Sequence, residues 1–223
     1  CYGVWNNIGE INFETLPNKF VIKCTHDSGS THIIKDKSKA NIVDICKDLQ
    51  AKLHPIGYTT CEPHYLSIQP RIIAEELLEE RELKDLSTSM IDYKVWCFNG
   101  VPNVILLCYD RHKDTNGHSV ASYDIYDVKT WEVKREYLEK DFRPNSHTKF
   151  PRPPKLEDMI ECATNISRGF PVVRVDFYCI NNKIYFGEMT FTSAGANCYY
   201  FSNLGQRVMG QAIDLSNIKI KKI

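Results

Sequence analysis

The sequence predicts an α+β protein with two lobes. Residues 16–78 contain short β-rich runs at 20–24, 33–34 and 71–78, and one segment, 38–53, with helical spacing of its apolar residues. From residue 92 onward, further β-rich runs are joined by Asn99-Gly100 and Asn181-Asn182, which are turn signals typical of antiparallel hairpins. We therefore expect a compact α+β lobe, followed by an antiparallel sheet with helices on one side.

In the first lobe, Phe20–Cys24 predicts a strand and the polar, Gly-containing residues 25–32 predict a loop. Residues 38–53 have apolar residues at positions 42, 45, 46, 49 and 53, which is the spacing of an amphipathic helix. Ser38 is a candidate N-cap for this helix, and Pro55-Ile-Gly57 would end it.

In the second lobe, strands are expected at 92–98, 104–109, 119–126, 172–179 and 183–191. Residues 141–154 are rich in Pro, Arg, Asn and His and predict a long loop. Residues 156–166 have the apolar stripe of an amphipathic helix, and residues 195–215 should form one or two short helices.

Composition excludes some classes of function. The 223 residues carry no net formal charge, which argues against a general nucleic-acid or membrane-surface binder. No apolar run approaches the roughly 20 residues of a membrane-spanning helix, so no membrane span is expected. The nine cysteines include no C-x-x-C pair, and several lie in apolar runs. Free cysteines of this kind are typical of a reducing compartment, so we expect a cytoplasmic protein.

The most informative segment is the hairpin of residues 172–191. Strand alternation places Arg174 and Asp176 on one face, and Glu188 follows in the second strand. Two carboxylates and an arginine suit a hard divalent cation that holds phosphate oxygens; a structural ion pair is the alternative. With a two-residue turn Asp176 would lie opposite Gly187, so a metal shared by Asp176 and Glu188 requires a longer loop or a β-bulge.

Several blocks together resemble a known superfamily. Arg174-Val-Asp-Phe-Tyr, a short turn and Ile184-Tyr-Phe-Gly-Glu-Met-Thr resemble the metal-binding end of the ATP-grasp fold. Residues 20–30 resemble its phosphate-binding strand and Gly/Ser loop, and residues 72–78 and 92–100 resemble its adenine hinge and the strand after it. The combination L-P-x-K-F-V-I-K-C-x-H, D-Y-K, F-N-G and Y-F-G-E-x-T-F is similar to the TupA-like branch, named after a teichuronopeptide-biosynthesis protein.

The resemblance implies an ATP-grasp fold of two α+β lobes with the nucleotide between them. Residues 16–78 would be the small lobe, with the phosphate loop and hinge, and residues 79–223 would be the large lobe, with the metal site. Residues 1–15 would be a remnant or linker of a preceding lobe, most of which the chain would lack.

The resemblance also assigns site residues. ATP would be bound by Lys23, Ser28, Gly29, Ser30, Glu75, Glu76, Leu78, Asp92 and Lys94. Lys23, Arg111 and Arg174 would be catalytic, stabilising the transferring phosphoryl group. Mg²⁺ would be held by Asp176, Glu188 and Thr190, where the family more commonly has Asn in place of Thr. From the residues alone, Lys23 also fits a solvated strand end, and Asp92 with Lys94 an ordinary ion pair.

The implied activity is that of an ATP- and Mg²⁺-dependent, ADP-forming ligase. An amino acid or other amine would be joined through an acyl-phosphate to a uronic acid, an acidic polymer or another carboxylate, alongside other enzymes of cell-surface polysaccharide biosynthesis. Arg143, Lys149 and Arg152 in the 141–154 loop suit an acidic saccharide, although basic residues in such a loop more often simply face solvent. The alternatives are an ATP-dependent sugar kinase or phosphotransferase and a non-catalytic ATP-grasp scaffold.

Overall fold

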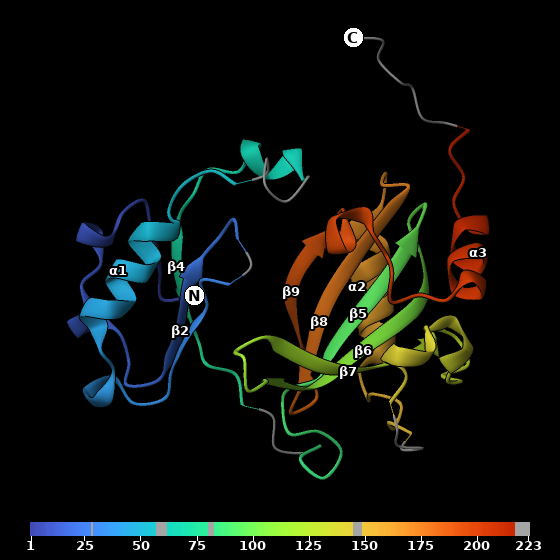
Figure 1. Ribbon diagram of the computed structural model, residues 1–223, viewed down its shortest axis with the longest axis horizontal. Coiled ribbons are helices and arrows are strands. Elements are labelled where there is room, and N and C mark those ends of the chain that lie inside the picture. The colour runs from blue at the N-terminus through green and yellow to red at the C-terminus, as the bar shows by residue number, and fades with distance from the viewer. Residues whose placement is uncertain (28, 57–61, 80–82, 145–148, 217–223) are drawn as a thin grey trace. The chain divides into compact units, whose positions relative to one another are not determined.

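The computed structural model describes residues 1–27, 29–56, 62–79, 83–144 and 149–216 (Figure 1). The chain divides into two compact units, Cys1–Leu78 and Glu79–Ile223, which we describe separately. Its short 3₁₀ helices are Ile8–Glu10, Phe13–Thr15, Lys37–Lys39, Pro63–Ser67, Arg135–Tyr137, Lys140–Phe142 and Ser193–Ala196.

The first unit is a four-stranded antiparallel sheet with one helix packed on it. The strand order is β1-β4-β2-β3, formed by Gly3–Trp5, Ile72–Glu75, Phe20–Cys24 and His32–Ile34. Helix α1, Ile42–Lys52, contributes Ile45 and Leu49 to a core with Phe20 and Ile22. Asn41 caps α1 in place of the expected Ser38, because residues 37–39 form a separate 3₁₀ turn capped by Asp36.

Residues 1–15 belong to the sheet and core of this unit. Strand β1 pairs with β4, with Val4 opposite Ile73. Trp5, Ile8 and Phe13 pack against the buried cluster around Phe20. The segment that we expected to be a remnant or linker therefore covers apolar surface of the first unit, which its own apolar residues favour.

The second unit contains a five-stranded antiparallel sheet with the order β7-β6-β5-β8-β9. The strands are Ser119–Asp127, Val101–Lys113, Asp92–Phe98, Val172–Ile180 and Lys183–Thr190. Both hairpin turns use the left-handed conformation that a two-residue turn of this kind requires: Asn99 and Gly100 have φ of 50° and 79°, and Asn181 and Asn182 have φ of 51° and 58°.

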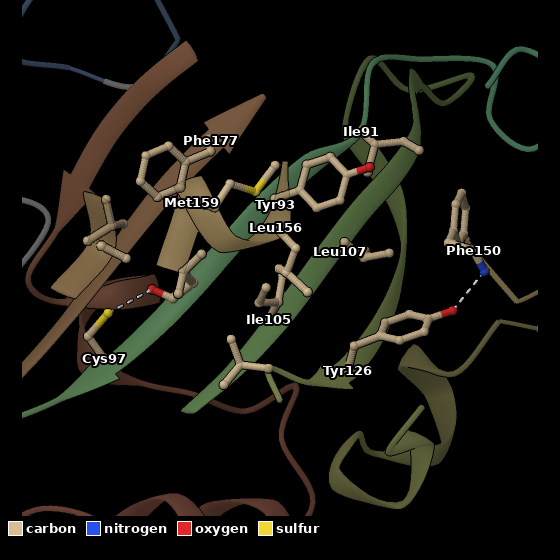
Figure 2. Close-up of a cluster of buried hydrophobic side chains, with 14 of the residues drawn as sticks. Ile91, Tyr93, Cys97, Ile105, Leu107, Tyr126, Phe150, Leu156, Met159 and Phe177 are labelled. Carbon is tan, nitrogen blue, oxygen red and sulfur yellow. Dashed lines mark hydrogen bonds between the residues drawn. The ribbon is translucent and has the colours of Figure 1, made fainter. Parts of the chain in front are cut away.

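One face of this sheet packs against helix α2, Leu156–Ser167 (Figure 2). Tyr93, Val95 and Phe177 of the strands contact the apolar stripe of α2, which includes Leu156 and Met159. At the edge of this core the Tyr126 hydroxyl accepts a hydrogen bond of 2.8 Å from the backbone N–H of Phe150 (Figure 2). Buried hydroxyls require such partners, so this bond fixes the segment before α2 on the sheet.

The opposite face has an apolar part and a polar part. Trp96 and Phe98 of β5 pack with Leu138, Phe201 and Met209, the last from helix α3, Asn203–Gln211. Helical elements thus pack on both faces of the sheet, and our expectation of helices on one side was wrong. The reason is that β5 is apolar at successive positions, so both of its faces require cover. The polar part of this face carries the charged residues described below.

Substitution of two glycines in α3 tests how closely this helix packs on its neighbours. A Cβ on Gly205 would lie 2.3 Å from the carbonyl oxygen of Tyr137, whereas one on Gly210 would meet nothing within 4 Å. We expect Gly205→Ala to lower the free energy of unfolding by about 1–3 kcal/mol, because α3 must move away from the backbone of the 3₁₀ helix Arg135–Tyr137. Gly210→Ala should raise it by up to about 1 kcal/mol through helix propensity. Urea unfolding of the two variants measures both changes in the free energy of unfolding. Equal changes would contradict the close approach of Gly205 to Tyr137.

Candidate functional site

Charged side chains gather on the polar part of this face of the second sheet, in strands β5, β8 and β9. Lys94 lies directly opposite Asp176 in the register of β5 and β8. Strand alternation therefore directs both side chains to one face, together with Asp92 and Arg174 two residues away on each strand. The Nζ of Lys94 lies 2.5 Å from Oδ2 of Asp176 and 3.3 Å from Oδ2 of Asp92.

A β-bulge brings the two predicted metal ligands together. The β8–β9 register shifts at Gly187, so that Phe177 pairs with Phe186 but Asp176 pairs with Glu188. The two-residue turn is retained, and the bulge supplies the one-residue shift that a shared site requires. Glycine suits this place, since a Cβ on Gly187 would lie 3.1 Å from the carbonyl oxygen of Asp176.

Arg174 holds Asp176 in a bidentate ion pair. Its Nε donates to Oδ1 at 2.7 Å and its Nη2 donates to Oδ2 at 2.8 Å. Its Nη1 donates to Oγ of Ser193 at 2.6 Å, and Nη2 also reaches Oγ1 of Thr190 at 2.9 Å and Oε1 of Glu188 at 3.2 Å. Because fork-shaped pairs fix geometry as well as charge, Arg174 aligns the ends of β8 and β9.

The electrostatics of this cluster follow from burial. Asp176 is only 2% exposed. Burial acts to raise its pKa, but the Lys94 ammonium and the Arg174 guanidinium hold the pKa of the Asp176 carboxyl below its usual range. Burial acts to lower the pKa of Arg174, and Asp176 reverses that and raises it. Asp176 and Arg174 are therefore both charged at neutral pH, although they are largely removed from water.

Glu188 and Thr190 lie at the accessible edge of the cluster. The hydroxyl of Thr190 donates to Oε1 of Glu188 at 3.1 Å while it accepts from Arg174. The Glu188 side chain is 62% exposed. Its Oε2 has no hydrogen-bond partner among the described residues. Hydrogen bonds to Oε1 thus orient Glu188, and its Oε2 is available to a bound ion.

Arg111 joins the cluster through Asp92. Its Nη2 forms an ion pair with Oδ2 of Asp92, which is 3% exposed. The β6–β7 register is irregular between Tyr109 and His112, and Asp110 there is left-handed with φ of 51°. This irregularity places Arg111 on the charged face. Burial and the nearby Asp92 raise the pKa of Tyr178, which lies on the same face as Asp176.

In the first unit, the predicted phosphate strand and hinge meet at Lys23 and Glu75. Their side chains form an ion pair of 2.6 Å across β2 and β4. In the adjacent loop, Gly29 has φ of 138°, and its carbonyl accepts from Nζ of Lys52 at 3.0 Å. Ser30 accepts from the backbone N–H of Cys24 at 2.8 Å. These contacts anchor the loop to α1 and β2.

The remaining predicted residues are placed as follows. Glu76 is exposed and Leu78 half-buried, both beyond the end of β4. Ser28 lies outside the described residues. Seven predicted site residues come together in the second unit: Asp92, Lys94, Arg111, Arg174, Asp176, Glu188 and Thr190.

Sequence reasoning missed three polar residues next to this cluster. Tyr178 follows Asp176 by two residues, so strand alternation alone would have placed it on the charged face. Ser193, which accepts from Arg174, and Tyr200, whose hydroxyl lies 2.8 Å from Oγ of Ser193, come from the segment after β9. No local pattern indicates that this segment folds back over the sheet.

The ion pairs make a stability prediction with a defined pH dependence. Asp176→Asn should lower the free energy of unfolding by ~3–5 kcal/mol at neutral pH, because it leaves two buried cations without their carboxylate. Since the folded pKa of Asp176 lies below the unfolded value of about 3.9, its contribution is present above that value and lost as the pH falls through the folded pKa.

The gap in unfolding free energy between wild type and Asp176→Asn should therefore shrink below about pH 4. Urea titrations at neutral pH and at about pH 3 measure it. Glu157→Gln is the matched control, because Glu157 forms an exposed ion pair with Arg152 and should leave stability close to wild type. A gap that stays constant on acidification would contradict the ion-pair account.

Comparison with known proteins identifies the fold family. A family model described as TupA-like ATPgrasp matches residues 1–214. A search of the curated proteins found no match. Within the described residues, no helix has both the length and the apolar character to cross a membrane.

Solved structures of ligases match most of this chain. D-alanine–D-alanine ligase from Bacillus anthracis is 11% identical, with a TM-score of 0.47 over 95% of this chain and 58% of that one. The enzyme of the same name from Helicobacter pylori is 13% identical, with a TM-score of 0.41 over 91% and 51%. The ATP-grasp ligase PsnB, complexed with a minimal precursor, is 10% identical, with a TM-score of 0.45 over 94% and 52%. This chain thus spans between half and three-fifths of the length of these proteins.

Proposed function

Since the chain belongs to the TupA-like ATP-grasp family, we propose that it is an ATP-dependent carboxylate–amine ligase. A carboxylate oxygen would attack the γ-phosphorus of ATP, giving an acyl-phosphate as the bond to ADP breaks. An amine would then attack the acyl carbon, and phosphate and a proton would leave as the amide forms. The observation that carries the proposal is the Lys94–Asp176–Arg174 cluster with Glu188 at its open edge.

The charge balance of the cluster suits phosphoryl transfer. Its cations Lys94, Arg111 and Arg174 are matched by its carboxylates Asp92, Asp176 and Glu188. The carboxylates fix the cations in place before any ligand binds, so little reorganisation is needed when charge develops on a transferring phosphoryl group. Asp92 is buried between Lys94 and Arg111, which favours a role in positioning these two cations over the ribose contact expected from the sequence.

The donor set fits Mg²⁺. This ion prefers one or two carboxylates together with phosphate oxygens and water. Asp176 and Glu188 lie opposite each other on neighbouring strands, and Glu188 keeps one oxygen without a described partner. Bound Mg²⁺ would supply charge neutralisation of the phosphate oxygens. We propose that Thr190 orients Glu188 through their 3.1 Å hydrogen bond. The sequence led us to expect that Thr190 would itself be a metal ligand.

Residues of the first unit would hold the rest of the nucleotide. Lys23 and the backbone of the loop with Gly29 and Ser30 are the proposed phosphate contacts, because an ammonium and backbone N–H groups suit the same anion. Ser28, in that loop, stays a prediction outside the described residues. The proposed adenine hinge is the end of β4 and the residues after it, Glu75, Glu76 and Leu78.

We further propose the substrates that the sequence resemblance implies. The carboxylate would be that of a uronic acid or acidic polymer, and the amine an amino acid. The reaction would take place in the cytoplasm, among enzymes of cell-surface polysaccharide biosynthesis. The free cysteines of the described residues agree with a reducing compartment.

Calorimetry with ATP and Mg²⁺ tests the metal ligands. We expect saturable binding to the wild type that depends on Mg²⁺, and its loss in the Asp176→Asn/Glu188→Gln double variant. Glu157→Gln again serves as the control, since it removes an exposed carboxylate from helix α2. Nucleotide binding that is unchanged in the double variant would exclude this metal site.

Analysis of the reaction products then distinguishes a ligase from a sugar kinase. Phosphate release that requires both a carboxylate and an amine marks a ligase, whereas a stable phosphate ester marks a sugar kinase.

Substitution of two lysines tests whether the first unit contacts the phosphates of ATP. Lys23→Met should weaken ATP binding by about 10- to 100-fold, the loss expected for a charge-assisted bond of about 1.5–3 kcal/mol. Lys39→Met removes a lysine whose side chain is 83% exposed and should leave binding unchanged. Calorimetry under identical salt conditions compares the two. Equal affinities for ATP would remove Lys23 from the nucleotide site.

A further inference from the structure

Strand β6 contains one extra residue at Asp110 and Arg111, and this residue decides which face of the sheet Arg111 occupies. Tyr109 and His112 lie three residues apart in β6, whereas their pairing partners in β7 lie two residues apart. Asp110, between them, is left-handed with φ of 51°. An extra residue with a local change of backbone direction is a β-bulge, which re-aims the side chains beside it.

Regular alternation would direct Arg111 to the other face of the sheet. Cys108 pairs directly with Asp92, so the two share the charged face, whereas Tyr109 belongs to the core that packs against α2. Continued alternation would then place Asp110 with Cys108 and Arg111 with Tyr109. The extra residue reverses the side that Arg111 takes. Its Nη2 accordingly forms the ion pair with Asp92 and lies 3.2 Å from Sγ of Cys108.

Three residues of the segment before β5 hold this bulge. The backbone N–H of Thr88 and its hydroxyl both donate to Oδ1 of Asp110, at 2.8 and 3.1 Å. In return, the backbone N–H of Asp110 donates to Oγ of Ser87 at 3.1 Å. The backbone N–H of Arg111 donates to Oγ of Ser89 at 2.9 Å. We call the four residues Ser87, Thr88, Ser89 and Asp110 the bulge clamp.

The bulge clamp supplies hydrogen bonds that a regular ladder would otherwise supply. The pairing of β5 with β6 ends at Asp92 and Cys108, just before the bulge. Beyond that point, the hydroxyls of Ser87 and Ser89 accept the two backbone N–H groups of the bulge. Backbone N–H groups without an acceptor are unfavourable, so these hydroxyls stabilise the irregular geometry. Aspartate also tolerates the left-handed conformation, because its short side chain forms local hydrogen bonds.

Arg111 depends on the bulge because few other contacts direct its side chain. The side chain is 50% exposed, and its hydrogen-bond partners among the described residues are Asp92 and Cys108. A long side chain with this exposure can turn its charged end into water at little cost. The direction of the backbone at Asp110 therefore selects the contact with Asp92, which also lies 3.3 Å from Nζ of Lys94.

We propose that Asp110 is a positioning residue of the charged site. Through the bulge clamp it holds Arg111 against Asp92, where Arg111 would stabilise the transferring phosphoryl group. The part that Arg111 plays in catalysis rests on the proposed function, whereas the dependence of Arg111 on Asp110 does not. Residues 87–89 lie in the segment that follows the first unit and precedes β5, so this connecting segment is part of the support of the site.

NMR of the guanidinium of Arg111 tests the bulge clamp without any ligand. In the ¹⁵N-labelled chain at low temperature, we expect resolved Nη–H signals from Arg111, because the ion pair with Asp92 slows rotation of the group. Arg111→Lys assigns these signals by their absence. Asp110→Ala should average them, since alanine neither accepts from Thr88 nor favours the left-handed conformation.

A conservative variant and a matched control separate the bulge clamp from a general structural effect. Asp110→Asn should keep the Arg111 signals, because its amide oxygen accepts the same hydrogen bonds and asparagine tolerates the left-handed conformation. Asp114→Ala is the control: Oδ1 of Asp114 also accepts two backbone N–H groups, in the same hairpin, and the signals should not change. If Asp110→Ala does not fold, Thr88→Val, which removes only a hydroxyl, should shift the signals toward their average.

Calorimetry with ATP and Mg²⁺ tests whether Asp110 acts through Arg111. Asp110→Ala and Arg111→Ala should each weaken binding by about 10-fold, the lower end for a charge-assisted bond, because the arginine side chain is half exposed. The double variant should bind no more weakly than either single variant, since all three lose the same contact. Losses that multiply to about 100-fold would show that Asp110 acts by another route, and would contradict the proposal.

The two measurements keep this proposal apart from the ligase proposal. Arg111 signals that are averaged in the wild type, unchanged in Asp110→Ala or lost equally in Asp110→Asn would overturn the bulge clamp and leave ATP binding to be judged by itself. Resolved signals that depend on Asp110, in a chain that does not bind ATP, would support the bulge clamp and refute the nucleotide site.

Discussion

The second unit depends on one interaction, the burial of Asp176 against Arg174 and Lys94. A carboxylate that is 2% exposed is stable as an anion only because two cations contact it, at 2.7 and 2.5 Å. Removing these charged groups from water costs free energy. Apolar side chains of similar volume in the same place would stabilise the fold at least as much. The nucleotide and metal site proposed above gives a reason for a sheet otherwise rich in apolar residues to retain these three charges.

The cluster is positioned by departures from regular sheet geometry. The bulge at Gly187 turns Glu188 toward Asp176, and the irregularity at Asp110 turns Arg111 toward Asp92. The left-handed residues after Ser193 bring a third segment over the same face. Regular strands and α2 form the support, and the charged residues of the proposed site lie where the regular pattern is interrupted.

Much of the fold was predictable from local patterns. The Asn-Gly and Asn-Asn turns, the amphipathic segment that became α2, and the alternation of Arg174 with Asp176 each have a short-range cause. The ATP-grasp resemblance, carried by motifs over most of the chain, is confirmed by the family match over residues 1–214. Packing on both faces of β5 was missed, because an apolar strand does not reveal which element covers each face.

The residues that gather in the charged cluster could be picked out one by one from the sequence, but their arrangement could not. The Asn181-Asn182 turn left Asp176 opposite Gly187, and only the structure shows the bulge that corrects the register. The hydrogen bond between Arg174 and Ser193 depends on the return of residues 193–200 to the sheet, a long-range contact that no spacing encodes.

A crystal structure of the chain with ADP and Mg²⁺ tests the central claim most directly. We predict a metal ion at about 2.1 Å from oxygens of Asp176 and Glu188, with Lys94 and Arg174 beside the phosphates. A nucleotide bound elsewhere, with Asp176 still held only by its two cations, would contradict the claim that this cluster exists to receive a phosphate–metal pair.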